Sequence, residues 1–214
     1  MNKPFPRLIG FAGKARSGKD TAGAYLVDNY NFLRYSFAQP LKDATKIMFG
    51  LTDEQIKDKE KAAEPWGMSP RDLYQRVGTD IARNIDVNVW VKGADMFVKK
   101  NPERSVVVTD VRFSNEAFWI RSQGGLVVFL HSDTRGIFEG GGHLSENGLE
   151  GSDVDIVLQN DGTIEALYAK LEELKKKRGH CMTDNWVKIS IFVVTLVCLG
   201  VVIYEIADII RIAV

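Results

Sequence analysis

Short apolar runs alternate with longer amphipathic segments up to about residue 180 of the chain. The apolar runs cover residues 8–12, 32–37, 105–110, 126–130 and 154–158. Runs of this length, bounded by turn signals, are typical of buried strands. Their alternation with helical segments predicts an α/β fold, in which a parallel sheet carries helices on both faces.

Capping and stop signals place helices between these strands. The expected helices cover residues 19–29, 40–49, 70–83, 89–99, 114–123 and 163–177. Ser69 is a good cap for the third of them, with Pro70 at its first position and Asp72 in its first turn. Gly124 and Gly125 stop the fifth. We expect the polar stretch 50–68 to be a mobile loop or a small helical insert.

The hydrophobic pattern changes near the C-terminus. No charged residue occurs from Ile189 to Tyr204, although this run is shorter than the ~20 residues that cross a bilayer core. Trp186 and Val187 extend it, with Lys188 reaching back to the surface. We therefore expect a main domain at 1–179, a linker at 180–185 and a transmembrane or membrane-associated helix at 186–214. There are two alternatives for this C-terminal segment: it is a core helix, or it is a separate small membrane protein joined at Met182.

Charge and cysteine content narrow the class of protein. The 28 basic and 28 acidic residues cancel, so no net charge favours nucleic acid binding. Cys181 and Cys198 have neither metal-site nor disulfide spacing, which favours a reducing compartment. The N-terminal residues lack the apolar core of a signal peptide. We expect the main domain to be cytoplasmic.

A glycine-rich loop joins the first expected strand to the first expected helix. It reads Gly13-Lys14-Ala15-Arg16-Ser17-Gly18-Lys19-Asp20-Thr21. Strand, glycine loop and helix form the context in which such a sequence binds phosphate through backbone N–H groups and the helix dipole. Lys19 would reach the β- and γ-phosphates of a nucleotide, and Arg16 would neutralise the transferring group. A turn that only caps the helix is the alternative.

Three residues are candidates for a magnesium site. The common motif has Ser or Thr after its lysine, whereas this chain has Asp20 there, followed by Thr21. A carboxylate is a hard oxygen ligand that suits Mg²⁺. Asp110 ends the strand 105–110, as the acid of a Walker B strand does, and would hold Mg²⁺ or its water shell. Capping of the turn after the strand is the alternative for Asp110.

Further polar residues are candidates for binding the acceptor of the phosphoryl group. They are Arg71, Arg76, Arg83, Asp86, Trp90, Arg112, His143 and Glu146. Arg112 could clamp a phosphate, or pair with Asp110 or Glu116 instead. The other arginines recur at roughly helical spacing with Gln75 and Thr79, on a face that is either a pocket wall or solvated. Asp86 and Trp90 could bind and stack a base, although Trp90 also suits the core. His143 and Glu146 follow three glycines, on either a hinged lid or a surface loop.

These segments together resemble the bacteriophage-type deoxynucleoside monophosphate kinases, within the P-loop nucleoside monophosphate kinase superfamily. The shared segments occur in the family's order between residues 7 and about 175, and Asp20 after the lysine fits this family. They are residues 13–21, 36–42, 48–52, 75–80, 86–90, 110–116, 143–146 and 160–162. The tail after residue 180 departs from the family's pattern.

The resemblance implies phosphoryl transfer from ATP, with Mg²⁺, to a deoxynucleoside monophosphate (dNMP), giving ADP and a dNDP. A homodimer is one option, and the cell would be an infected bacterial host if the chain is phage-derived. Two rival functions stay open: a P-loop kinase of dephospho-coenzyme A or phosphomevalonate, and a membrane-tethered nucleotide-binding module without turnover. The sequence does not indicate which bases are accepted.

Truncation after Gly179 tests the predicted helix at 186–214. Lys175–Arg178 and Lys188 precede the apolar run, so the positive-inside bias keeps the main domain on the cytoplasmic side of the inner membrane. The full chain should need detergent for extraction, whereas the truncated chain should stay in solution and keep its activity. A full chain that is monomeric in buffer without detergent would contradict the membrane helix.

Overall fold

A parallel five-stranded sheet forms the centre of the computed structural model, which describes residues 5–134 and 149–176. Its order is β2-β3-β1-β4-β5. The strands are β1 (Leu8–Ala12), β2 (Leu33–Tyr35), β3 (Val106–Val111), β4 (Leu126–His131) and β5 (Ile156–Gln159). All five predicted strands are present with small shifts at their ends, and the predicted α/β class is confirmed.

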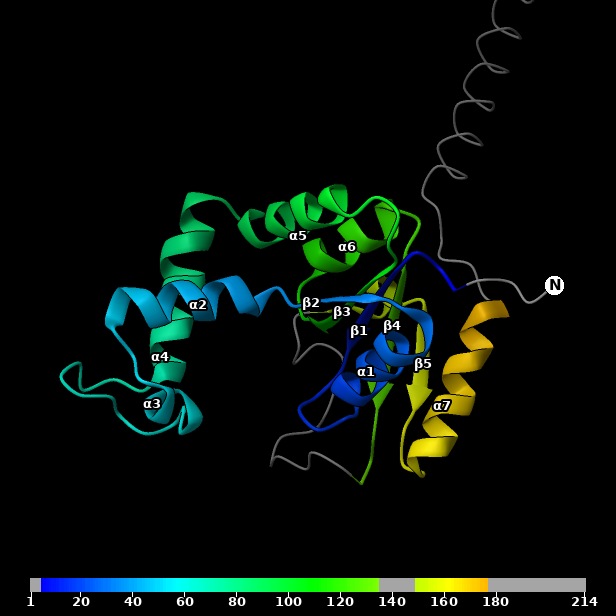
Figure 1. Ribbon diagram of the computed structural model, residues 1–214, viewed down its shortest axis with the longest axis horizontal. Helices are drawn as coiled ribbons and strands as arrows, with labels where there is room; N and C mark the ends of the chain where they lie inside the picture. Colours follow the sequence, from blue (N-terminus) through cyan, green and yellow to red (C-terminus); the bar gives the residue numbers. More distant parts are fainter. Residues whose placement is uncertain (1–4, 135–148, 177–214) are drawn as a thin grey trace, which may run out of the picture. The chain divides into compact units, whose positions relative to one another are not determined.

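Helices cover both faces of the sheet (Figure 1). The helices on one face are α1 (Lys19–Tyr30) and α7 (Ile164–Glu173), and those on the other are α5 (Val89–Lys100) and α6 (Ser114–Ser122). Successive strand residues point to opposite faces. Ile9 and Phe11 of β1 therefore join the core under α1 and α7, whereas Leu8 and Ala12 join the core under α5 and α6.

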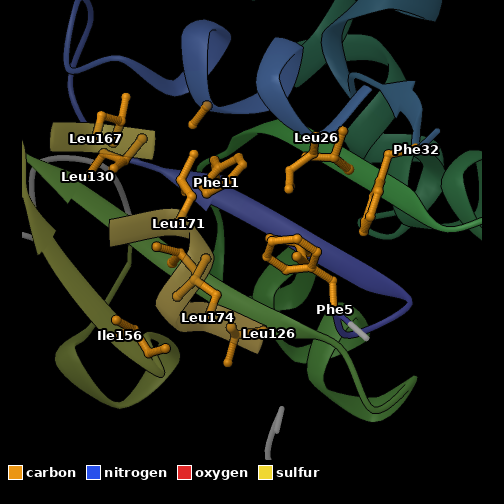
Figure 2. Close-up of a cluster of buried hydrophobic side chains, with 14 residues drawn as sticks. Phe5, Phe11, Leu26, Phe32, Leu126, Leu130, Ile156, Leu167, Leu171 and Leu174 are labelled. Carbon is orange, nitrogen blue, oxygen red and sulfur yellow. The ribbon is translucent and has the colours of Figure 1, made fainter. Parts of the chain in front are cut away.

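The core under α1 and α7 fixes the helix that follows the glycine loop (Figure 2). Leu26 of α1 and Leu171 of α7 are fully buried, as is Phe11. Burial of a side chain of this kind contributes roughly 1.5–3 kcal/mol to folding. In addition, a Cβ at Gly23 would lie 2.4 Å from Cγ2 of Thr109, so the glycine allows α1 to approach β3 closely. The start of α1 is thus held firmly against the sheet.

A helical arm, residues 38–88, lies between β2 and α5 in sequence. Its helices are α2 (Ala38–Phe49), α3 (Asp53–Lys57), α4 (Pro70–Gln75) and the π-helix η1 (Arg76–Arg83). Figure 1 shows α2, α3 and α4 grouped together at one side of the view. Leu51, Ala63 and Leu73 form a separate small core within the arm. Since α3 lies in the stretch 50–68, the small helical insert considered from the sequence is present.

The predicted helix that ends at Arg83 changes geometry halfway. Ser69 caps the helix as expected and forms a capping box with Asp72, but the α-helix ends at Gln75 and a π-helix continues to Arg83. A π-helix closes its hydrogen bonds over five residues, so α-helical spacing no longer tells which of its side chains share a face. The π-helix therefore breaks the regular spacing on which the prediction of one polar face for Arg71, Arg76 and Arg83 rests.

Two short 3₁₀ helices, η3 (Gly151–Asp153) and η4 (Leu174–Lys176), complete the described elements.

Several predictions fall outside the described residues: those for His143 and Glu146, for the linker 180–185 and for the helix 186–214. Within residues 5–134 and 149–176, no helix is both long enough and apolar enough to span a bilayer.

Candidate functional site

The glycine loop curls tightly between β1 and α1. Positive φ angles occur at Gly13 (136°), Arg16 (65°) and Gly18 (99°), a backbone region that glycine enters without strain. A Cβ at Gly13 would lie 2.3 Å from the carbonyl oxygen of Leu130, so only glycine fits there. Gly18 caps α1 without a side-chain hydrogen bond. The first N–H groups of α1 can therefore face an anion.

Lys19 folds back over this curl. Its Nζ donates to the carbonyl oxygens of Gly13 (2.7 Å) and Lys14. Burial lowers the pKa of Lys19, and the nearby Arg112 guanidinium lowers it further, while Asp20 and Asp110 oppose these effects. An anionic phosphate would be a stronger, charge-assisted partner for this ammonium than neutral carbonyl groups are. The predicted placement of Lys19 beside a phosphate position is consistent with this geometry.

Asp20, a predicted magnesium ligand, already has a basic partner. Its exposed carboxylate pairs with Arg34 of β2, and Arg34 also donates to Oγ1 of Thr109 at 3.2 Å. Thr21 follows in the first turn of α1, with its side chain partly exposed. Sequence reasoning missed Arg34, because its contacts depend on β2 lying beside β3. A metal bound directly to Asp20 would compete with this ion pair.

Asp110 caps a helix that belongs to the arm. Its carboxylate accepts hydrogen bonds from Ser36 Oγ (2.6 Å) and from the backbone N–H groups of Phe37 (2.9 Å) and Ala38 (2.9 Å). These groups lie at the start of α2, where Phe37 provides no side-chain cap. A carboxylate has about four acceptor positions, so one position is left for a water molecule of a hydrated metal ion. Asp110 thus caps α2, and not the turn after its own strand, which was the alternative considered from the sequence.

Arg112 is exposed beside Lys19. Its guanidinium makes no ion pair or hydrogen bond within residues 5–134 and 149–176. The alternative pairing with Asp110 or Glu116 is not formed there, because Glu116 binds the backbone N–H of Arg112 (2.8 Å) instead. The positive charge of Arg112 also lies close enough to Lys19 to lower the pKa of the Lys19 ammonium. This arrangement suits a strongly anionic ligand.

Glu116 holds Arg83 in a buried ion pair. Arg83 Nη2 lies 3.0 Å from Glu116 Oε1, and the side chains are 13% and 3% exposed. The Arg83 guanidinium also lies 3.9 Å over the ring of Phe113. Burial raises the pKa of Glu116 to about 7, although the backbone N–H groups of Arg112 and Phe113 and the charge of Arg83 oppose this. Arg83 therefore has a partner within the protein, which its sequence position did not reveal.

The remaining acceptor candidates each have different surroundings in the structure. Arg76 lines a concave region of about 560 Å³ with Met68, Asp72, Gln75, Thr79 and Asp80. Arg71 pairs instead with Glu60 at 2.8 Å. Asp86 pairs with Lys92 and accepts a hydrogen bond from Asn88 N at 2.8 Å. Trp90 packs on the core, and its indole N–H donates to Gly78 O at 3.3 Å. Arg71, Asp86 and Trp90 thus already have partners within the protein, whereas Arg76 lines the concave region.

Asn160 is a site residue that sequence reasoning missed. Its buried Nδ2 donates to the carbonyl oxygen of Ser17 at 2.9 Å, and its backbone N–H donates to His131 O at 2.7 Å. A Cβ at Gly18 would lie 2.4 Å from that Nδ2. The turn Asn160-Asp161-Gly162 was visible in the sequence, but its contact with the glycine loop depends on the packing of residues far apart along the chain.

A family model and curated relatives identify the family to which the chain belongs. The family model described as deoxynucleotide monophosphate kinase matches residues 7–67 and 47–171. A protein of Acanthamoeba polyphaga mimivirus that carries this family's name is 40% identical over 185 residues, which are 77% of this chain and 93% of its own. The deoxynucleotide monophosphate kinase of Enterobacteria phage T4 is 26% identical over 242 residues, covering 79% of this chain and 99% of its own. Shikimate kinase from Aquifex aeolicus, a solved structure, has a TM-score of 0.40 at 19% identity and covers 77% of this chain and 92% of its own.

The raised pKa of Glu116 predicts a specific pH dependence of stability. In the folded chain the pKa of Glu116 is about 7, against 4.5 for an unperturbed glutamate side chain. The folded state therefore binds more protons between these values, so the stability associated with this proton is lost as pH rises toward 7. Relative to Glu116→Gln, the wild-type free energy of unfolding should fall by about 2–3 kcal/mol from pH 5 to pH 8. Urea denaturation at each pH measures this, and a difference that is constant or rises with pH would contradict it.

Proposed function

Because the chain belongs to the deoxynucleotide monophosphate kinase family, we propose that it transfers the terminal phosphoryl group of ATP to a dNMP, giving ADP and a dNDP. One observation of the structure supports this most strongly. The glycine loop curls around the ammonium of Lys19, and the exposed guanidinium of Arg112 lies close to it. Two cations placed beside a loop of this shape suit the phosphates of a nucleotide.

Catalysis by such a site is positioning together with charge stabilisation, because phosphoryl transfer needs little covalent chemistry from the protein. We propose that the backbone N–H groups of residues 13–21 hold the ATP phosphates, and that Lys19 and Arg16 stabilise charge on the transferring group. The exposure of Arg16 in the loop allows this contact. Arg16 and Lys19 would then act in the transition state more than in the ground state.

The donor set fits a magnesium ion held with the ATP phosphates. Mg²⁺ would neutralise phosphate charge when bound, with Asp20, Thr21 and Asp110 as the proposed oxygen ligands or water-shell partners. Asp110 has an acceptor position to spare beyond its three hydrogen bonds. Asp20 is exposed beside the loop, and its partner Arg34 is exposed too. A hydrated ion therefore suits these residues better than a directly bound one.

We assign the acceptor to the side of the site that carries Arg112 and the arm. Arg112 would bind the dNMP phosphate, and Arg76 with its concave surroundings would contact the rest of the acceptor. Asp86 and Trp90 stay proposals for contacts with the base, since each already has a partner within the protein. His143 and Glu146 as lid residues, the homodimer and the membrane anchor also stay proposals.

Product detection tests the reaction. The full chain is incubated with ATP, Mg²⁺ and, separately, each dNMP, each ribonucleoside monophosphate, dephospho-coenzyme A and phosphomevalonate. We expect ADP and a dNDP to form together with at least one dNMP. Turnover with one of the other metabolites alone would replace the proposed substrate, and nucleotide binding without any product would support the rival binding module.

Lys19→Ala tests the assignment of the phosphate loop. The loss of one electrostatic donor at a transition state typically lowers the rate by ~10²–10³, and we expect a loss of this size with an unchanged circular dichroism spectrum. Lys99→Ala is the matched control, because Lys99 is an exposed lysine paired with Asp95 on α5. If Lys19→Ala turns over like the wild type, the loop does not act as proposed.

Asp110→Asn tests the metal assignment. The substitution removes the negative charge but nearly keeps the shape, so the Mg²⁺ concentration for half-maximal rate should rise at fixed ATP and dNMP. Ser36→Ala is the comparison, because it removes one hydrogen bond to the same carboxylate and leaves its charge in place. Its Mg²⁺ midpoint should not change. An unchanged midpoint in Asp110→Asn with a large rise in the KM for dNMP would limit Asp110 to the acceptor side.

A further inference from the structure

The segment Asp110–Glu116 contacts the helical arm at both of its ends. The chain passes from the sheet into the arm at residues 36–38, which we call the first crossing, and leaves the arm at residues 83–88, the second crossing. At the first crossing, Asp110 accepts hydrogen bonds from Ser36 Oγ (2.6 Å) and from the N–H groups of Phe37 and Ala38 (both 2.9 Å). The carboxylate on β3 thereby fixes the first turn of α2. The arm begins where its first helix is capped by a residue of the sheet.

The second crossing is fixed by two further residues of the same segment. Asn115 Nδ2 donates to Val87 O (3.1 Å) and to Asn88 Oδ1 (2.9 Å). Glu116 Oε1 binds Arg83 at the end of η1 at 3.0 Å. Both ends of the arm are therefore attached to one stretch of chain, which runs from the end of β3 into α6.

The ion pair at the second crossing has a well-defined geometry. Arg83 Nη1 also donates to Val87 O at 3.2 Å, while its guanidinium covers the ring of Phe113. Because Arg83 and Glu116 are both buried, removing one partner would leave an uncompensated charge away from water. Such a pair resists small rotations of the arm more than an exposed pair would.

The arm has few other attachments to the sheet among the described residues. Its helices α2, α4 and η1 pack on one another, and its small core is separate from those of the sheet. Trp90 of α5 adds one hydrogen bond, to Gly78 O at 3.3 Å. The arm is thus a unit whose placement depends mainly on its two ends.

Arg112 lies between the two points of attachment. Glu116 Oε2 accepts hydrogen bonds from the backbone N–H groups of Arg112 (2.8 Å) and Phe113 (3.2 Å), which fixes the local backbone. The side chain of Arg112 is exposed and acts on the pKa of Lys19. One segment therefore contacts both ends of the arm and carries a cation whose charge acts on Lys19 of the phosphate loop.

We propose that Asp110, Asn115 and Glu116 are positioning residues, which clamp both ends of the arm and so set its distance from the phosphate loop. The assignment of the acceptor to the arm rests on the proposed function. The contacts of Ser36, Asn115 and Glu116 join the sheet to the arm and do not involve residues 13–18. Loosening these contacts should therefore change acceptor binding and leave ATP binding unchanged.

The test compares three clamp variants with a matched control. Glu116→Gln and Asn115→Ala weaken the second crossing, and Ser36→Ala weakens the first without altering the Asp110 carboxylate. Asp155→Asn is the control, because its carboxylate also pairs with an arginine, Arg121 (3.2 Å), and accepts a backbone hydrogen bond from Val127 (2.8 Å), away from the arm. Ser36→Ala and Asn115→Ala keep the proposal testable if Glu116→Gln fails to fold.

Steady-state kinetics give the first measurement. In each clamp variant the KM for dNMP should rise about 5- to 30-fold, as expected for the loss of one or two hydrogen bonds to or beside a charged group. The KM for ATP should stay within about twofold, and Asp155→Asn should change neither constant. An equal rise of both KM values, or no change in the KM for dNMP, would overturn the proposal.

Hydrogen exchange gives a measurement that does not depend on turnover. Backbone amides of residues 38–49 and 70–88 should exchange faster in the clamp variants, while those of β1 and β3 keep their wild-type rates. Faster exchange throughout the chain would show a general loss of stability, and unchanged exchange in the arm would show that the clamp does not hold it; either result overturns the proposal. If the wild type phosphorylates no dNMP, the proposed function fails, and exchange alone decides whether the clamp holds the arm.

Discussion

The close approach of backbone and side chains around residues 13–23 is the constraint on which the site depends. A Cβ would lie 2.3 Å from Leu130 O at Gly13, 2.4 Å from Asn160 Nδ2 at Gly18 and 2.4 Å from Thr109 Cγ2 at Gly23. Each glycine therefore allows a contact with a different part of the sheet: β4, the turn after β5, and β3. Together these contacts hold the loop and the start of α1 in one position, so that backbone N–H groups are oriented before a ligand arrives. Electrostatic stabilisation is most effective when the donors need no rearrangement.

Around this loop the acidic side chains have partners within the protein, which leaves the basic side chains more available to bind a ligand. Arg34 pairs with Asp20, and the start of α2 occupies most of the Asp110 carboxylate. Lys19 has only backbone carbonyl partners, and the guanidinium of Arg112 has no acidic partner within the described residues. Burial of Lys19 and, after it, the nearby charge of Arg112 lower the pKa of Lys19, so keeping this ammonium charged costs free energy. An anionic ligand would remove this cost, and binding is favoured to that extent.

Local sequence signals predicted the elements well and their mutual contacts poorly. Apolar runs such as Val106–Val108, the cap at Ser69 and the spacing around Lys19 are local, and the structure contains each as expected. The π-helix at Arg76–Arg83 was missed, because no residue there signals a change of helical period. The contacts of Asn160 with Ser17 and of Glu116 with Arg83 join residues far apart in the sequence. Such pairs follow from strand order and helix packing, which the hydrophobic pattern alone does not specify.

Asp110 shows how one carboxylate can serve both the arm and the phosphate side. Its Oδ2 accepts hydrogen bonds from Ser36 Oγ and Ala38 N, while Oδ1 accepts only the one from Phe37 N. A metal ion bound directly to Oδ2 would displace the cap of α2 and loosen the arm. A water molecule of a hydrated ion needs only the remaining acceptor position on Oδ1. Since Mg²⁺ gives up its water reluctantly, the two roles are compatible when a water molecule lies between Asp110 and the ion. The start of the arm could then keep its place while a nucleotide with a hydrated metal ion binds and leaves.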